Sequence, residues 1–403
     1  MKKHSVALFI FIDALGWEIV QQHPAFLKDL APFRKRLRTI FGYSSACDPS
    51  IISGRLPNEH GLWSSYYYSP QTSPFRPLRY LRFLPQVVTD SARVRGRLSQ
   101  WLARLYGYTG YFQIYNIPFQ HLQYFDYAEK KRIYAPSGLP NGKNIFDEMY
   151  ERSVAYHVCA AGYHDPSKFA ALNDDLQRKD IHLGYVTLGK LDGIMHMQGT
   201  QSAQVGELLK WYQQQIEATY RIAQAQYEDV SVYVFADHGM HDVTGTYDLQ
   251  EQIGSLGLMY GRDYVAMYDS TMARFWFLTE EAKKLIHSKL EEVSKGRILP
   301  DEELEKMGVF FSDGRYGETI FLLDPGILMV PSYMGRKRIP GMHGYHPDED
   351  ASYAAMLSNR PLPERLTWIH HIYHLMEDEL EEQGIRISSK EEKVSSSAST
   401  ILT

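Results

Sequence analysis

Four short stretches of almost purely apolar residues are the feature that most restricts how this chain can fold. Polar or helix-forming segments separate them, and they cover Val6–Ile12, Ser153–Cys159, His182–Leu188 and Val230–Phe235. Strands that are buried on both faces give continuous apolar runs, whereas a half-exposed strand alternates apolar and polar side chains. The pattern therefore predicts an α/β fold with a mostly parallel central sheet and helices on both of its faces.

A carboxylate follows three of these runs closely. Asp13 comes directly after the first run, Asp192 lies shortly after the third, and Asp237 lies just beyond the fourth. Because the carboxyl ends of parallel strands meet at one edge of a sheet, and α/β proteins build their sites there, we expect these three acids to share a site.

The composition of the chain excludes several classes of protein. Its 403 residues have room for a large α/β domain with a substantial insert, and 44% of them are hydrophobic, which fits a globular protein. A net charge of −5 provides no global basic field for nucleic acid, so we expect no nucleic-acid partner. Only Cys47 and Cys159 are present, which argues against a disulfide framework and for a reducing compartment.

The N-terminal residues imitate a secretion signal, with two lysines before an apolar run. The run ends at the carboxylate of Asp13, and no small-residue cleavage site follows, so we expect a buried strand and a cytoplasmic location. No other stretch approaches the roughly 18 apolar residues of a spanning helix, so we expect no transmembrane segment.

Two segments interrupt the alternation of strands and helices. Residues 66–135 contain 17 aromatic residues, with seven arginines between Arg76 and Arg104 and only Asp90 to balance them, and we interpret them as an insert. Residues 262–322 are expected to form a small α+β cap. The catalytic domain would then comprise residues 1–261 and 323–387, and the Ser-, Lys- and Glu-rich residues 388–403 would form a disordered tail.

Further polar motifs accompany the strand-end acids. Residues 42–61 place Ser44 and Ser45 where a loop enters a helix, whose first amides favour an anion. Asp192-x-x-x-His196 puts two ligand types one helical turn apart, and Asp237 is followed directly by His238. His343 lies between glycines in a late loop. Taken singly, each motif also fits a helix cap, a surface pair or an ordinary turn.

Taken together and in this order, the motifs resemble the alkaline phosphatase superfamily, and within it the type I phosphodiesterase/nucleotide pyrophosphatase family. The matching pieces are Asp13, the serines ahead of Ser53-Gly54, Pro57-Asn58-Glu59-His60-Gly61, the Asp192 and Asp237 motifs, and His343-Gly344-Tyr345. The resemblance implies an alkaline phosphatase-like three-layer sandwich. It places the nucleophile nine residues before Ser53, at Ser44, with Ser45 as the rival.

The resemblance also implies a centre for two divalent metal ions. One ion would be held by Asp192, His196 and His343, and the other by the residues Asp13, Ser44, Asp237 and His238. Nitrogen and oxygen donors without thiolate suit Zn²⁺, with Mn²⁺ as the alternative.

The activity implied is metal-dependent hydrolysis of a phosphodiester or phosphoanhydride through a seryl-phosphoryl intermediate. The alternatives are a phosphomonoesterase, a phosphonate hydrolase, and a phosphoryl or phospho-alcohol transferase using the same site. Ser65 stands where nucleotide pyrophosphatases usually carry an asparagine that contacts a phosphate oxygen. It is retained as a substrate-binding candidate, while the change weakens the case for a nucleotide in particular.

The substrate class and partners follow from the same resemblance. We expect a phosphate ester that is either a small molecule or linked to lipid or glycan. The arginines and aromatics of residues 66–135 could pack in a core, contact such a substrate or rest on a membrane surface. The sequence does not indicate an oligomeric state.

Two other patterns are interpreted as structural. Cys47-Asp48-Pro49-Ser50 resembles the sulfatase nucleophile motif, but Ile51 replaces its arginine, so Cys47 is expected to be a buried thiol. The three histidines at 370, 371 and 374 have a spacing that would permit a metal, and we assign them instead to an amphipathic surface helix over 365–382.

Overall fold

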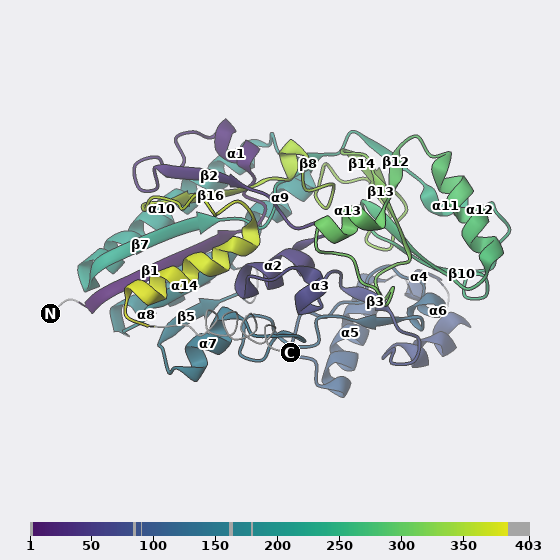
Figure 1. Ribbon diagram of the computed structural model, residues 1–403, viewed down its shortest axis with the longest axis horizontal. Helices are drawn as coiled ribbons and strands as arrows, with labels where there is room; N and C mark the ends of the chain where they lie inside the picture. The colour runs from purple at the N-terminus through teal and green to yellow at the C-terminus, as the bar shows by residue number, and fades with distance from the viewer. Residues whose placement is uncertain (1–2, 84–85, 90, 161–163, 179, 386–403) are drawn as a thin grey trace, which may run out of the picture.

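The computed structural model describes residues 3–83, 86–89, 91–160, 164–178 and 180–385, and a six-stranded sheet forms one side of the molecule (left half of Figure 1). The strand order is β2-β16-β7-β1-β6-β5. The strands are β1 (Lys3–Ile12), β2 (Phe33–Leu37), β5 (Tyr156–Cys159), β6 (Leu183–Leu188), β7 (Tyr227–Phe235) and β16 (Ala354–Ser358). The expected tail at 388–403 lies outside the described residues.

The inner part of this sheet is parallel, as predicted. β1 pairs in parallel with β6 and β7, and β5 pairs in parallel with β6. β16 runs antiparallel to both β7 and β2, which makes the sheet mixed at one side. Every residue of Val6–Ile12 is buried, which explains the uninterrupted apolar run. β5 begins at Tyr156 and not at Ser153, because Ser153 has a left-handed φ of 54° and cannot extend the strand.

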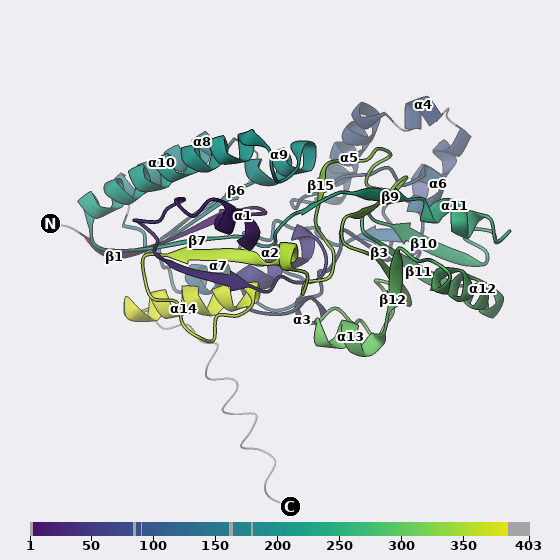
Figure 2. The same ribbon diagram turned by 90° about the horizontal axis from the view of Figure 1, so that it is seen from above.

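Helices cover both faces of the sheet and complete the three layers (Figure 2). One face carries α8 (Asp165–Arg178), α9 (Lys190–Gln198) and α10 (Ala203–Gln226). The opposite face carries α2 (Ser44–Ser53), α7 (Ile145–Glu151) and α14 (Ile372–Glu382). The shorter elements of this lobe are α1 (Trp17–Gln22), α3 (Pro57–His60), η2 (Asp350–Ser352) and η3 (Ile369–His371). The architecture confirms the predicted fold class.

The C-terminal helix differs from its expectation. The residues before it follow the edge of the sheet, because the Arg38 amide donates to the Thr367 carbonyl and Trp368 forms a parallel bridge with Arg38. The α-helix therefore begins at Ile372 and not at residue 365. Its side chains at Met376 and Leu380 are fully buried, so it packs on the lobe and is not a surface helix.

The segment at 66–135 forms a mainly helical unit that packs against a second sheet, which is described below. Its elements are β3 (Tyr66–Tyr68), η1 (Arg76–Phe83), α4 (Gln86–Thr89), α5 (Ala92–Tyr106), α6 (Phe119–Leu122) and β4 (Phe125–Tyr127). β3 and β4 pair in antiparallel fashion, so the two ends of this unit lie side by side.

The segment at 262–322 contains a second, antiparallel sheet in the order β10-β11-β13-β12. Its elements are β10 (Tyr264–Tyr268), β11 (Met272–Phe277), α12 (Glu280–Glu291), β12 (Gly296–Leu299), α13 (Asp301–Lys306) and β13 (Thr319–Leu323). α12 begins where Thr279 caps it, with its hydroxyl accepting from the Ala282 amide. The remaining short elements are β8 (His241–Asp242), β9 (Gly245–Tyr247), α11 (Leu249–Gly254), β14 (Ile327–Met329) and β15 (Gly341–Met342), where β8 pairs with β15 and β9 pairs with β14.

The 66–135 unit and the antiparallel sheet bury one common hydrophobic core, separate from the core around the six-stranded sheet. Phe75, Leu102 and Phe125 from the first segment pack with Val265 and Phe275 from the second. Two segments that are distant in sequence therefore pack against each other. In the described ranges, no helix combines the length and the apolar composition that crossing a membrane would require.

Candidate functional site

The strand-end acids lie at the carboxyl edge of the parallel strands. Asp13 directly follows β1, and Asp237 follows β7, which is the neighbour of β1 in the sheet. Asp192 is in the first turn of α9, which begins two residues after β6, the other neighbour of β1. The topology therefore delivers all three carboxylates to the same edge, as expected from their positions in the sequence.

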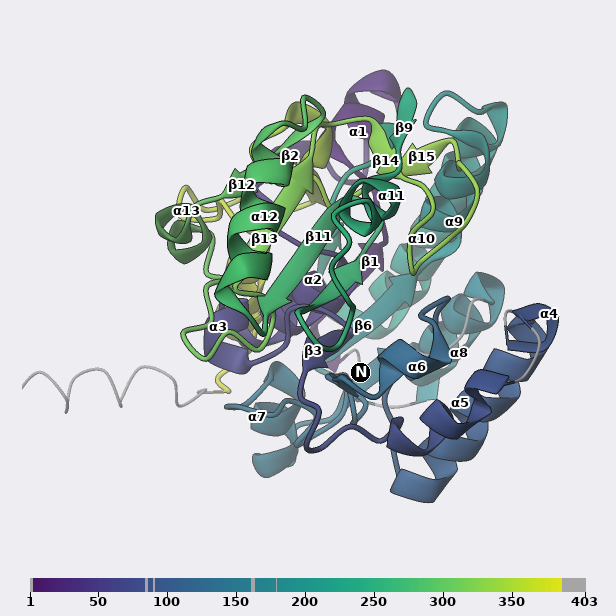
Figure 3. The same ribbon diagram turned by 90° about the vertical axis from the view of Figure 1, so that its right-hand side faces the viewer.

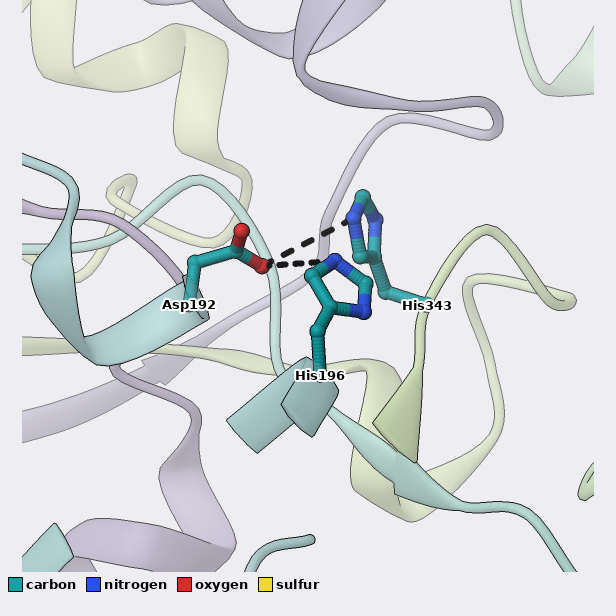
Figure 4. Close-up of side chains that lie close together, drawn as sticks. All are labelled: Asp192, His196 and His343. Carbon is teal, nitrogen blue, oxygen red and sulfur yellow. Dashed lines mark ion pairs between the residues drawn. The ribbon is translucent and has the colours of Figure 1, made fainter. Parts of the chain in front are cut away.

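One group of side chains consists of Asp192, His196 and His343 (Figure 4). The Asp192 Oδ1 atom lies 3.2 Å from His196 Nε2 and 3.8 Å from His343 Nε2. His196 Nδ1 donates to the Gly341 carbonyl at 2.8 Å, which leaves the Nε2 lone pair of the neutral ring free. Gly341 belongs to β15, so this short strand both orients His196 and leads into His343.

A second group surrounds His238. Its Nε2 atom lies 3.0 Å from Asp237 Oδ2, 3.6 Å from Asp13 Oδ1 and 3.2 Å from Ser44 Oγ. His238 Nδ1 donates to the Gly239 carbonyl at 2.9 Å, so in the neutral ring Nε2 is again the free nitrogen.

The two groups are adjacent. The rings of His238 and His343 stack with centroids 3.6 Å apart. Ligand atoms of Asp13, Asp192 and His238 also lie within 4.8 Å of one another, so Asp192 reaches both groups. The structure thus brings together all seven side chains for which the family resemblance implies a two-metal centre.

The polar atoms of this cluster fit divalent cations. Buried atoms without a hydrogen-bond partner among the described residues include Asp13 Oδ1, Asp192 Oδ1, Asp237 Oδ2 and His343 Nδ1. Buried carboxylate oxygens that lack donors are costly unless a cation compensates them. Carboxylate and imidazole are also the ligand types that Zn²⁺ and Mn²⁺ accept.

The electrostatics of the cluster reflect its crowded carboxylates. Burial, reinforced by the charges of Asp237 and Asp192, raises the pKa of Asp13 well above its ordinary value. Burial opposes the charged form of His238, but the Asp237 carboxylate outweighs it and raises the pKa of His238 to about 9. Burial and the neighbouring charged histidines lower the pKa of His343 well below its ordinary value. The protein therefore concentrates negative charge that a bound cation would neutralise.

The two candidate nucleophiles occupy different surroundings. Ser44 is the first residue of α2, where the helix dipole favours a developing negative charge, and its Oγ faces His238. The Ser45 hydroxyl instead donates to the Trp63 carbonyl at 3.3 Å. Geometry thus favours Ser44 as the residue that faces the cluster.

A hydrogen-bonded group that the sequence did not indicate holds the residue before Ser44. The Tyr43 hydroxyl lies 2.9 Å from Thr271 Oγ1, and the Thr271 hydroxyl donates to the Gly344 carbonyl at 2.8 Å. The Tyr43 ring also contacts the edge of the His343 ring, with centroids 5.7 Å apart. Tyr43 and Thr271 are 228 positions apart, and no sequence signal would have linked them.

The remaining candidates lie outside the cluster. The Ser65 carbonyl accepts from the Ala128 amide, and its side chain forms a hydrogen bond with Tyr127. Cys47 is fully buried, and burial raises the pKa of its thiol well above the ordinary value, which fits the expected inert thiol. Among the described residues, His370, His371 and His374 are not part of any group with metal-binding geometry.

Comparisons with known proteins agree with this arrangement. The family model for type I phosphodiesterase/nucleotide pyrophosphatase matches residues 7–346. A search of curated proteins finds no significant sequence match.

Solved structures show the same fold. The human ectonucleotide pyrophosphatase/phosphodiesterase 5 superposes with a TM-score of 0.65 at 12% identity, covering 95% of this chain and 96% of that chain. The murine protein of the same name gives 0.64 at 13% identity, covering 95% and 96%. An inactive form of the murine protein in complex with AMP gives 0.63 at 14% identity, covering 94% and 95%. Since the family model spans most of the chain, this protein belongs to the type I phosphodiesterase/nucleotide pyrophosphatase family of the alkaline phosphatase superfamily, and it is a hydrolase that acts on phosphoric ester bonds.

Proposed function

We propose that the chain hydrolyses a phosphodiester or phosphoanhydride through a seryl-phosphoryl intermediate on Ser44, at a centre for two divalent cations. The single observation that carries this proposal is the position of Ser44 Oγ, which lies at a helix N-terminus and 3.2 Å from His238 Nε2 inside a cluster of carboxylates and imidazoles. The family gives the reaction class, and the seryl mechanism is our inference from this geometry.

The side chains divide the work as follows. Asp192, His196 and His343 would hold one cation, and a second would be held by the residues Asp13, Ser44, Asp237 and His238. When bound, two such cations lower the pKa of a serine hydroxyl and offset the charge that builds on phosphorus. The backbone carbonyls of Gly341 and Gly239 hold the two histidines with Nε2 free for ligation.

The reaction then proceeds in two displacements at phosphorus. In the first, the Ser44 hydroxyl gives up its proton and Oγ forms a bond to phosphorus while the bond to the leaving oxygen breaks, and that oxygen takes up a proton. The N-terminus of α2 favours the negative charge that Ser44 must carry during the attack. In the second, a water oxygen attacks the phosphoserine, Ser44 Oγ leaves, and a proton returns to the serine.

Zn²⁺ is our choice of cation. The seven donors are nitrogen and oxygen atoms, and Cys47 is not one of them: its buried Sγ lies 3.6 Å from Thr39 Oγ1, whose hydroxyl donates to the Asp237 carbonyl. Such a donor set supports Zn²⁺, with Mn²⁺ as the alternative.

A diester or anhydride substrate is supported by the family and by the bulk of the additions around the site. The murine relative was captured with AMP, which supports a nucleotide as one candidate for the substituent on phosphorus. Ser65, in place of the asparagine of nucleotide pyrophosphatases, supports a different substituent, such as a lipid or glycan.

One panel tests the proposal. Protein stripped of metal and then reloaded with Zn²⁺ or Mn²⁺ is assayed on bis-p-nitrophenyl phosphate, p-nitrophenyl phosphate, a nucleotide diphosphosugar and a p-nitrophenyl phosphonate. We expect activity only after reloading, with the highest kcat/KM on the diester or the anhydride. Full turnover by the stripped protein, or a preference for the monoester or the phosphonate, would contradict the proposal.

The nucleophile is tested with matched variants. Ser44→Ala should lose at least about a thousandfold in kcat while it still binds Zn²⁺, because the other ligands remain. Ser45→Ala is the control, and it should keep most of the activity because its hydroxyl bonds to the Trp63 carbonyl. The opposite ranking of the two variants would assign the nucleophile to Ser45. Products formed with added alcohols would show whether water or an alcohol is the preferred acceptor.

A further inference from the structure

The outward surface of helix α5 has a composition unlike the rest of the molecule. The side chains with i, i+3 and i+4 spacing on this surface are all exposed, and they are Arg93, Arg97, Gln100, Trp101, Arg104 and Leu105. We refer to these six residues as the outer face of α5. It extends over about 18 Å of helix, and Figure 3 shows α5 at the margin of the molecule.

The opposite side of α5 is anchored, so the orientation of the outer face is fixed. Arg95 is buried and donates to the Ile117 carbonyl at 2.9 Å, and the Ser99 hydroxyl accepts from the Ile114 amide at 2.9 Å. Leu102 is buried in the core shared with the antiparallel sheet. Rotation of the helix to hide Trp101 or Leu105 would break all of these contacts.

The outer face is both basic and apolar. Trp101 is 55% exposed and Leu105 is 58% exposed, and they alternate with three arginines. The sequence from 71 to 107 contains seven arginines, no lysine and a single acid, although the whole chain carries a net charge of −5. The neighbouring η1 has a similar composition, because its Arg76, Arg79 and Tyr80 are exposed. Residues 71–107 therefore carry a local excess of positive charge with apolar side chains beside it.

We propose that the outer face of α5 docks on the surface of an anionic lipid bilayer. The arginines would pair with lipid phosphates, while Trp101 and Leu105 would enter the boundary between headgroups and acyl chains. A soluble polyanion such as a nucleic acid would satisfy the arginines but leave both apolar side chains in water. A second copy of the chain would bring the arginines of two such faces against each other, which like-charge repulsion disfavours.

Vesicle binding by the full chain tests this proposal. The protein is sedimented with vesicles of phosphatidylcholine alone, and with vesicles containing about 30% phosphatidylglycerol. We expect binding to the anionic vesicles and little to the neutral ones. The variant Arg93→Gln/Arg97→Gln/Arg104→Gln should bind about 100-fold more weakly, at about fivefold per charge. The variant Trp101→Gln/Leu105→Gln should keep its attraction at low salt but dissociate when salt screens the charges.

The matched control is α12, another exposed helix with basic residues, where acids accompany Lys283, Lys284 and Lys289. Their triple replacement by Gln should leave vesicle binding unchanged. All variants should hydrolyse a soluble diester at the wild-type rate, which verifies their folding independently of lipid. Equal binding to neutral and anionic vesicles, no binding at all, or binding to dextran sulfate without binding to vesicles would each overturn the proposal. So would a control variant that loses as much binding as the arginine variant.

Discussion

His60 provides a sharp test of how the helix that carries Ser44 is supported. The imidazole is fully buried, its Nδ1 accepts from the Leu62 amide at 3.2 Å, and its Nε2 donates to Ser50 Oγ at 2.9 Å. The Ser50 hydroxyl donates in turn to the Ala46 carbonyl at 2.8 Å, within the first turns of α2. Both ring nitrogens are therefore committed in the neutral form, and protonation of Nδ1 would break the bond to Leu62.

The pKa of His60 determines how much stability the protein loses when the pH is lowered. Burial, helped by the positive charge of Arg55, lowers the pKa of His60 from its ordinary 6.5 to about 3. A histidine whose pKa is lower in the folded protein than in the unfolded chain binds its proton more readily when unfolded. Above pH 6.5 the titration of His60 does not change the free energy of unfolding, and as the pH falls from 6.5 toward 3 it lowers that free energy. The linkage relation gives a loss of about 2 kcal/mol between neutral pH and about pH 5.

The assay compares the free energy of unfolding in urea near pH 7.5 and near pH 5, in the presence of a chelator. His60→Gln keeps a donor toward Ser50 but leaves the Leu62 amide without its acceptor, so we expect a loss of about 1–3 kcal/mol near neutral pH. The further loss on acidification should be about 2 kcal/mol smaller than in the wild type. His4→Gln, at an exposed position of β1, is the control and should not change the acid sensitivity. If the loss of stability on acidification were the same in His60→Gln as in the wild type, the neutral, buried His60 would not be its source.

Three further outcomes are expected from the site. Burial and neighbouring carboxylates raise the pKa of Asp13, so the metal-free protein loses stability as the pH rises toward that pKa. In scanning calorimetry with a chelator, Asp13→Asn should therefore unfold at a higher temperature than the wild type. Added Zn²⁺ should raise its unfolding temperature less than that of the wild type. Tyr43→Phe removes the hydroxyl that binds Thr271, so we expect kcat/KM to fall about fivefold with little loss of folded protein, and an unchanged kcat/KM would show that this bond does not position Ser44. Gly344→Ala should lower both the unfolding temperature and the activity, because φ is +90° there and a Cβ atom would lie 2.6 Å from the Tyr43 ring; full activity in this variant would contradict the observed packing.

The central strands were predictable because their burial determines their composition. β1 and β6 lie inside the sheet with helices on both faces, so nearly every position had to be apolar. β2 was not predicted, since it lies at the edge of the sheet and its Phe-Arg-Lys-Arg-Leu sequence is largely exposed or half-buried. β16 is short, and its place between β2 and β7 depends on pairing with residues more than 100 positions away.

In the candidate site, too, some residues could be predicted from the sequence and others could not. The proposed metal ligands are side chains in short motifs, and the order of these motifs resembles a known family, which was sufficient to propose them. The groups that position them are different, because a backbone carbonyl such as that of Gly341 has no signature in sequence. The Tyr43 contact with Thr271 likewise depends on how two separate hydrophobic cores meet.

The buried Arg274 connects the antiparallel sheet to the stretch of chain after α2, the helix that carries the proposed nucleophile Ser44, and to the 66–135 segment. From β11 it pairs with Asp269 at 2.9 Å, and it donates to the Ser64 hydroxyl and the Tyr66 carbonyl, both at 3.0 Å. Ser64 and Tyr66 continue the chain from the nucleophile helix into the 66–135 segment, so one guanidinium ties the antiparallel sheet to both. Since β11 also begins next to Thr271, which binds Tyr43, the same strand contacts the nucleophile segment at two points. A shift of the antiparallel sheet would therefore move Tyr43 and Ser64, which lie on either side of α2 and α3, so we expect changes in this sheet to alter the position of Ser44.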